Sequence, residues 1–288
     1  MSPLALALVV TGAVLHATWN LSAKRASDGD SVAFVWLMSV VSMGLALPFG
    51  LVSWAVDPPS MGLSAWIAVV ASGVVHGVYF LLLQLGYRHG DLSVVYPVAR
   101  GTGPLFAVAA AVLLFGERPG VAGSVGIGAV LVGIVLVSGL VSAPGSRKRS
   151  AGVGWGTLTG LWIATYTVID AWAVTSLGLS PLVFFLLSLV LTAIVMAPFA
   201  LREPACLGAE WRQSRRQIVT VGILSPVAFT LVLFALRLAP LAYVAPLREV
   251  SMMVGVFYGA WVLRERVTAT RLAGVLCMIA GVVAFTLA

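Results

Sequence analysis

Apolar runs of about twenty residues follow one another along the whole chain. A helix rises ~1.5 Å per residue, so ~20 apolar residues span the ~30 Å hydrocarbon core of a bilayer. Polar clusters separate the runs, among them Lys24 to Asp30, Asp57-Pro58-Pro59 and Arg147-Lys148-Arg149. The pattern therefore predicts an all-α membrane protein with ten transmembrane helices. The predicted spans are 3–22, 32–54, 63–86, 93–115, 121–141, 152–174, 181–201, 217–237, 242–263 and 269–287.

The second half of the chain repeats features of the first. At an offset of 149 residues, 91–97 aligns with 240–246, and His76 aligns with Ser225. After one deletion, Glu117-Arg118 aligns with Glu265-Arg266. The predicted repeats are 1–143 with spans 1–5 and 150–288 with spans 6–10. Because five is an odd number, the repeats are inverted in the membrane, as in many alternating-access transporters.

A proline followed by an arginine occurs at matching places in spans 4 and 9. The two segments are Tyr96-Pro97-Val98-Ala99-Arg100 and Ala245-Pro246-Leu247-Arg248-Glu249. Proline frees a backbone carbonyl, and an arginine at bilayer depth costs at least ~2.5–3.5 kcal/mol. Residues this costly, kept in both halves, indicate that the two helices form the functional site.

Composition and charge narrow the class of protein further. Hydrophobic residues make up 60% of the 288, charged residues 9%, and the mean hydropathy is +1.07. Soluble domains carry about 25% charged residues, so a soluble fold is excluded. The net charge of +7 comes from short loops between apolar runs, which indicates membrane topology and not nucleic-acid binding. The two cysteines have no metal-binding spacing, and we expect no metal and no cofactor.

The distribution of basic residues predicts an orientation. The loops after odd-numbered spans, together with the adjoining Arg271, hold 13 of the 17 Lys and Arg residues. The positive-inside rule then places these loops in the cytoplasm and both termini outside, in a multi-pass protein of the cytoplasmic membrane.

The end of the first repeat resembles the ten-span EamA transporters of the drug/metabolite transporter superfamily. The matching residues run from Pro104-Leu105-Phe106-Ala107 through Gly116-Glu117-Arg118-Pro119 to the glycine-rich segment 126–133. The second copy departs from this pattern, because no proline matches Pro104 and Leu263 to Arg266 replaces the Gly-Glu turn. The resemblance implies a central cavity lined by spans 1, 3, 4, 6, 8 and 9. Many relatives are thought to keep their termini in the cytoplasm, which conflicts with the charge count. Residues 15–24 also resemble a subgroup linked to phosphonate use.

Arg100 and Arg248 are the first candidates for substrate binding. Inverted helices bring their side chains toward the midplane, where guanidinium groups suit a carboxylate or phosphonate. Structural pairing is the alternative, and Arg100 is the better candidate because no carboxylate is near it in the sequence. Glu249 and Asp170 could bind an amine, carry a coupling proton or form internal ion pairs. The remaining candidates for the substrate site are His16, Trp19, Asn20, His76, Tyr79, Phe80, Tyr96, Trp162 and Tyr166.

The leading interpretation is a secondary transporter, not an enzyme, that moves a small anionic or zwitterionic metabolite by alternating access. Phosphonate-type or amino-acid-type uptake is an alternative, and a multidrug or cation exporter or a membrane scaffold is a weaker one. The sequence lacks a phosphate-binding Gly-rich loop and the His-Glu-x-x-His and Gly-x-Ser-x-Gly motifs of enzymes. Glycines such as Gly126, Gly133 and Gly281 could pack helices within a monomer or between two chains.

Overall fold

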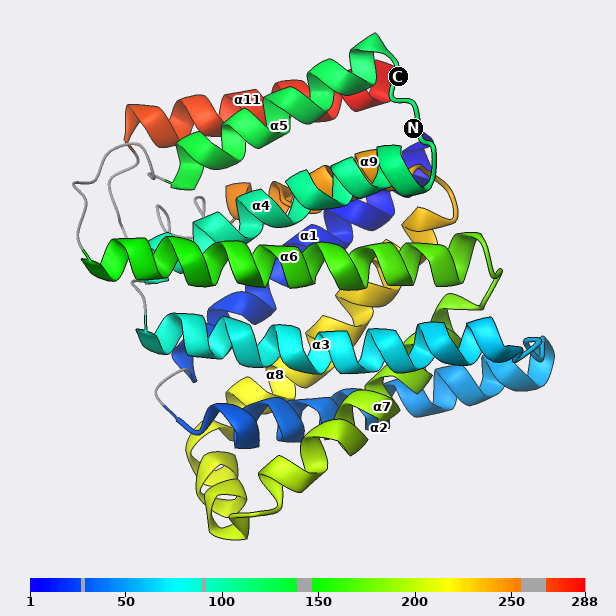
Figure 1. The fold of residues 1–288 in the computed structure, drawn as a ribbon, viewed down its shortest axis with the longest axis vertical. Helices are drawn as coiled ribbons and strands as arrows, with labels where there is room; N and C mark the ends of the chain where they lie inside the picture. The colour runs from blue at the N-terminus through cyan, green and yellow to red at the C-terminus, as the bar shows by residue number, and fades with distance from the viewer. Residues whose placement is uncertain (27–28, 90–91, 139–146, 255–267, 288) are drawn as a thin grey trace.

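The protein is a bundle of helices that run back and forth beside one another (Figure 1). The computed structural model describes residues 1–26, 29–89, 92–138, 147–254 and 268–287. The helices are α1 (Pro3–Arg25), α2 (Ser31–Val56), α3 (Leu63–His89), α4 (Leu92–Leu114), α5 (Val121–Ser138), α6 (Arg147–Thr175), α7 (Pro181–Ala200), α8 (Pro204–Leu236), α9 (Leu241–Leu247) and α11 (Ala269–Leu287). Within the described residues, α1 to α4, α7 and α8 are each long and apolar enough to span a membrane. The all-α fold with several membrane spans is therefore confirmed.

Three predicted boundaries differ from the observed ones. The segment 202–216 was expected to be a loop, but α8 already begins at Pro204, whose fixed φ suits the first position of a helix. The helix bends at Ser214 (φ −119°, ψ 16°). Helix α6 begins at Arg147, before the predicted residue 152. The ninth span was expected to be continuous, but α9 ends at Leu247; its residues 255–263 and residues 139–141 of the fifth span lie outside the described residues.

Local signals explain where several helices begin and end. The Asp30 carboxylate accepts a hydrogen bond from the Ala33 N–H at 2.8 Å, which caps α2. Pro181 occupies the first turn of α7. Gly116 and Gly178, which follow α4 and α6, adopt φ of +64° and +67°, a conformation that a side chain disfavours. The Gly-Glu turn of the first repeat is thus a sterically required bend.

Figure 1 shows how the helices are layered. Helix α6 lies between α3 and α4, α9 lies beside α4, and α1 packs on α8. Helices α2 and α7 pack together and contact α8 and α3 respectively. The α5–α11 pair forms a separate layer next to α4 and α9. The central helices α3, α4, α6, α8 and α9 therefore surround the region where the candidate residues lie.

The α5–α11 pair is held by close backbone contact at glycines. A Cβ on Gly133 would lie 2.7 Å from the Gly274 carbonyl, and a Cβ on Gly281 would lie 2.7 Å from the Gly126 carbonyl. These four glycines pack helices within one chain, which is one of the two predicted alternatives. Gly128 has no such neighbour within 4 Å.

Two interhelical hydrogen bonds reflect the internal repeat. The Ser42 hydroxyl on α2 donates to the Gly222 carbonyl on α8 at 3.0 Å. The Thr192 hydroxyl on α7 donates to the Gly73 carbonyl on α3 at 2.9 Å. Gly73 and Gly222 are 149 residues apart, so the same contact is made once from each half.

Candidate functional site

The helix of the ninth span breaks at Arg248 and Glu249. Helix α9 ends at Leu247, two turn residues follow, and the chain is helical again from Val250. The Glu249 N–H bonds the Pro246 carbonyl at 3.0 Å, a tighter turn than an α-helix makes. At the other end of α9, the Glu117 carboxylate accepts the N–H groups of Leu241 and Ala242 at 2.9 and 2.8 Å. Interrupted helices at membrane depth are typical of transporter binding sites.

Arg100, Arg248 and Glu249 form a buried charged cluster at this break. Arg100 Nε lies 3.2 Å from Glu249 Oε2, and Arg100 Nη1 donates to Glu249 Oε1 at 3.3 Å. Arg248 Nε lies 3.8 Å from Glu249 Oε1. The three residues are 3%, 4% and 0% exposed. Two guanidinium charges thus share one carboxylate, which leaves the cluster with one surplus positive charge.

Each arginine has further contacts that fix its orientation. Arg100 Nη2 donates to the Ser251 hydroxyl at 3.0 Å, and its guanidinium lies 5.6 Å from the Tyr96 ring centroid. Arg248 Nη2 donates to the Tyr166 hydroxyl at 3.3 Å, and its guanidinium lies 5.7 Å from the centroid of that ring. Arg100 Nε and Arg248 Nε are both buried without a hydrogen-bond partner among the described residues. Arg100 Nε lies 3.2 Å from the Glu249 carboxylate and Arg248 Nε lies 3.8 Å from it, so Arg248 is the less tightly paired arginine.

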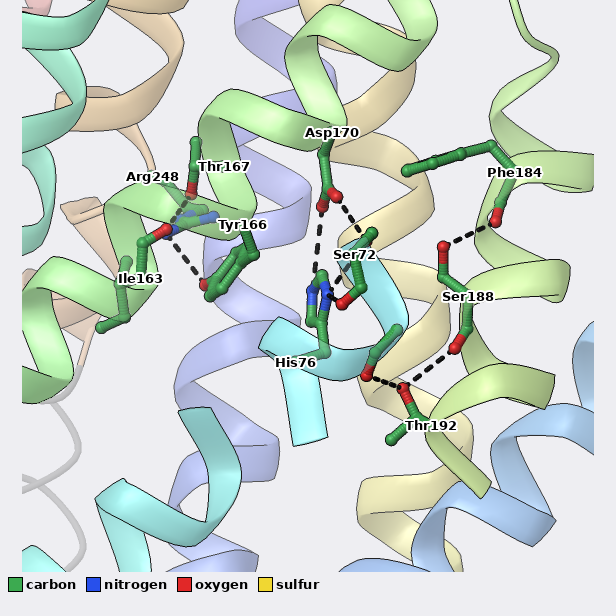
Figure 2. Close-up of polar contacts among 11 residues, drawn as sticks. Ser72, His76, Ile163, Tyr166, Thr167, Asp170, Phe184, Ser188, Thr192 and Arg248 are labelled. Atoms are coloured by element: carbon green, nitrogen blue, oxygen red, sulfur yellow. Dashed lines mark hydrogen bonds and ion pairs between the residues drawn. The ribbon is translucent and has the colours of Figure 1, made fainter. Parts of the chain in front are cut away.

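A second polar cluster joins α3 to α6, and Figure 2 shows its side chains pointing toward one another. The Ser72 hydroxyl donates to Asp170 Oδ1 at 2.6 Å, and His76 Nε2 lies 3.7 Å from Asp170 Oδ2. His76 Nδ1 lies 2.9 Å from the Ser72 carbonyl oxygen. Asp170 and His76 are 3% and 6% exposed. Asp170, for which the sequence left several roles open, therefore pairs with the buried His76.

Aromatic rings connect the two clusters. The Tyr166 ring stacks on His76 with centroids 4.2 Å apart, and its hydroxyl reaches Arg248. Tyr79 lies 5.3 Å from Tyr166, and Phe229 lies 5.9 Å from it. His16 packs edge-on against Trp19 at 4.5 Å, and Phe80 packs on Tyr79 at 4.8 Å. The rings form one apolar wall along α1, α3, α6 and α8.

A cavity between α2, α3, α7 and α8 reaches His76. Its lining is Met38, Ser39, Ser42, His76, Phe80, Phe185, Ser188, Leu189, Thr192, Ser225 and Phe229. Four of its hydroxyls donate their protons to backbone carbonyls: Ser39 to Val35, Ser42 to Gly222, Ser188 to Phe184 and Thr192 to Gly73. Such hydroxyls present oxygen lone pairs to the cavity, so the lining accepts hydrogen bonds from water or from a cation.

Most of the predicted site residues lie in these clusters. Arg100, Arg248, Glu249, Tyr96 and Tyr166 are brought together at the helix break, and His16, Trp19, His76, Tyr79 and Phe80 form the aromatic wall with Tyr166. Asn20 donates its amide proton to the His16 carbonyl of its own helix at 2.8 Å and lines a second cavity with Trp19 and Phe80. Trp162 is half-buried and packs against the apolar core.

The structure removes one reason for preferring Arg100. Arg100 was favoured because no carboxylate is near it in the sequence, but Glu249 from the other half of the chain is its partner. Ser72, Ser251 and Phe229 also contact the site, although they were not among the predicted residues. Two of them had a signal: Ser72 lies one helical turn before His76, and Phe229 lies 149 residues after Phe80. Among the described residues, no three His, Cys, Asp or Glu side chains are grouped to hold a metal ion.

Known proteins resemble this chain over nearly its whole length. The sequence matches the EamA-like transporter family over residues 3–139 and again over 150–287. A solved structure titled "Crystal structure of protein" superposes with a TM-score of 0.77 at 16% identity, covering 98% of this chain and 96% of that one. At that identity the likeness concerns the fold alone. A search of curated proteins gave no match.

Proposed function

Because this chain belongs to the EamA-like transporter family, we propose that it moves a small anionic or zwitterionic metabolite across the cytoplasmic membrane. It is a multi-pass membrane transporter with two EamA domains, and it does not belong to an enzyme family. The proposed mechanism is alternating access, in which the two inverted repeats rock around a site between them.

The surplus positive charge at the helix break is the observation that supports an anionic ligand. Arg100, Arg248 and Glu249 are nearly inaccessible to solvent and together carry one uncompensated charge. Uncompensated charge is costly in a dry site, so a bound anion is stabilised there. The planar guanidinium fork matches carboxylate and phosphonate oxygens. Arg248 is the primary anion ligand in this proposal because its Nε lies 3.8 Å from the Glu249 carboxylate, whereas Arg100 Nε lies 3.2 Å from it.

A zwitterion fits the same site through a second contact. The Glu249 carboxylate lies between the two arginines and could accept an ammonium group, while the anionic end of the ligand takes its place on Arg248. The aromatic wall beside Tyr166 would hold the apolar part of such a ligand. This arrangement supports carboxylates, phosphonates and amino acids as substrate classes.

The cavity at His76 favours a cation exporter as the second candidate function. Its hydroxyls present lone pairs, and Phe80, Phe185 and Phe229 provide ring faces for a cation. A substrate that binds there would not need Arg248. The two functions therefore differ in which variants they tolerate.

Counterflow in proteoliposomes separates these functions. Vesicles would be loaded with a carboxylate, a phosphonate, an amino acid or a quaternary ammonium compound, and exchange of labelled compound would be followed. We expect exchange of an anion or zwitterion that is reduced in Arg248→Gln and retained in Arg237→Gln, since Arg237 is exposed at the end of α8. Exchange of the quaternary ammonium compound alone would contradict the anion site and support the second function.

The orientation in the membrane is also a proposal. The loops after α1, α3 and α7 are basic, so we place them in the cytoplasm and both termini outside. The substrate would then meet the helix break from opposite sides in the two states of the transport cycle.

A further inference from the structure

We propose that His76 and Asp170 bind the proton that drives transport, at the gap between His76 Nε2 and Asp170 Oδ2. The proposal rests on the transporter function given above and names its coupling ion. It assigns proton binding to a cluster separate from Arg100, Arg248 and Glu249, which bind the substrate.

The hydrogen bonds of His76 determine where its first proton lies. His76 Nδ1 is 2.9 Å from the Ser72 carbonyl oxygen, and a carbonyl oxygen only accepts. Nδ1 therefore carries the proton of the neutral ring, and Nε2 presents a lone pair. That lone pair lies 3.7 Å from Asp170 Oδ2, and Nε2 has no hydrogen-bond partner among the described residues. Two acceptors face each other across a gap that one proton would occupy.

Asp170 is oriented toward this gap by a separate donor. The Ser72 hydroxyl donates to Asp170 Oδ1 at 2.6 Å and leaves Oδ2 for His76 (Figure 2). A proton taken from water binds the Nε2 lone pair and leaves hydroxide to the solvent. The pair then changes from a neutral imidazole with a carboxylate to an imidazolium with a carboxylate. Its net charge rises from −1 to 0, and the reverse step returns the proton to water.

The cavity leaves room for water beside the pair. His76 lies on its lining, whose hydroxyls from α2 and α7 accept hydrogen bonds. Water needs two to four polar partners, and this lining provides them. Glu249 is 0% exposed and lies between two arginines, so protonating it would leave both guanidinium charges without their counter-ion. Proton exchange is therefore assigned to His76 and Asp170.

Other charged or titratable groups near the pair come from several helices. Tyr79 lies on α3, Tyr166 on α6, His16 on α1 and Arg100 on α4, and Arg248 and Glu249 follow α9. The described residues of α7 and α8 that line the cavity beside His76 are not titratable: they are Phe185, Ser188, Leu189, Thr192, Ser225 and Phe229. Of the charged side chains, Arg248 is linked to the pair most directly, because the Tyr166 ring stacks on His76 and its hydroxyl accepts from Arg248.

This link predicts the sign of the coupling. A proton on His76 adds positive charge beside the arginine site, which favours a bound anion. Linkage is reciprocal, so a bound anion favours the proton by the same factor. The proton and the anion therefore move together in the same direction.

The proton site can be tested without a known substrate by nuclear magnetic resonance of ring-labelled histidine. The full chain has three histidines, and His→Gln variants would assign His16, His76 and His89. We expect the neutral His76 ring to be the Nδ1–H tautomer and its resonances to change on acidification as Nε2 takes up a proton. Asp170→Asn, and also Ser72→Ala, which keeps the carboxylate, should each change the pH at which the His76 resonances move. Asp57→Asn, an exposed acid after α2, should leave it unchanged.

Two results would overturn the proposal: a His76 resonance that acidification leaves unchanged, or a response to acidification that neither Asp170→Asn nor Ser72→Ala affects. A transport arm then tests the coupling, with the panel used for counterflow. His76→Gln should abolish accumulation driven by a pH gradient and retain counterflow. Gradient-driven accumulation equal to wild type would overturn the coupling role. If wild type shows no counterflow, the transporter function fails, while the histidine titration still decides whether a proton binds here.

Discussion

Replacing Glu249 by Gln should destabilise the protein more than any single replacement of its partners. Glu249 is 0% exposed, contacts Arg100 at 3.2 and 3.3 Å, and lies 3.8 Å from Arg248. The amide keeps the shape of the side chain and removes its charge, so two guanidinium groups lose their counter-ion. Breaking a buried ion pair by removing one partner costs ~3–5 kcal/mol.

The cost of the partner variants should be graded by geometry. Arg100→Gln removes the bidentate contact but leaves Glu249 with Arg248, so its cost should lie near or below the lower end of that range. Arg248→Gln removes only the 3.8 Å contact and a 3.3 Å hydrogen bond to Tyr166, so it should cost least. The double variant Arg100→Gln/Glu249→Gln should cost less than the sum of the single variants, with a coupling of ~0.5–3 kcal/mol.

The assay is reversible unfolding of the purified protein in mixed detergent, with Asp57→Asn as the control that removes an exposed acid. If Glu249→Gln stays within ~0.5 kcal/mol of that control, which is the usual range for surface substitutions, the carboxylate does not balance the arginines. The argument for surplus positive charge would then fail as well.

Two further predictions concern topology and packing. Gly208→Cys in a Cys206→Ser background should react with membrane-impermeant maleimide only from the cytoplasmic side. The reason is that Gly208 is exposed in the basic segment before Ser214. Labelling only from outside would reverse the proposed orientation and leave the fold intact. Gly133→Val should lower the unfolding temperature because the valine side chain would collide with Gly274 and Met278. Gly128→Val is the control, because a side chain there would enter open space. Equal unfolding temperatures for the two variants would contradict the packing of α5 on α11.

The sequence predicted the helices well because apolar length is a local property. Each of the ten predicted spans overlaps a helix, although the ninth is interrupted at Arg248 and Glu249, and the proline-arginine segments lie where the charged cluster forms. The start of α8 was missed because Arg212, Arg215 and Arg216 read as loop residues, although they lie exposed on a helix. Basic residues are compatible with a helix outside the bilayer, so charge alone could not distinguish the two.

The pairing within the site was not predictable from neighbouring residues. Arg100 and Glu249 are 149 residues apart, the same offset that relates the two repeats, so they occupy equivalent places in the two halves. Equivalent positions next to a two-fold axis can touch, and a difference in charge then makes an ion pair. The contact between Asp170 and Ser72 lacked even this signal, because it depends on how α3 and α6 are rotated against each other.

Ligand affinity in Arg248 variants tests the central claim most directly. The ligand would be the compound with the strongest counterflow, and affinity would be measured by calorimetry on the purified protein in detergent. A charge-assisted hydrogen bond in a dry site contributes ~1.5–3 kcal/mol, so Arg248→Ala should weaken binding roughly 10- to 150-fold. Arg248→Lys keeps the charge without the fork and should recover part of the loss, and Arg237→Gln should bind as wild type does. Equal affinity in wild type and Arg248→Ala would contradict the assignment of the helix break as an anion-binding site.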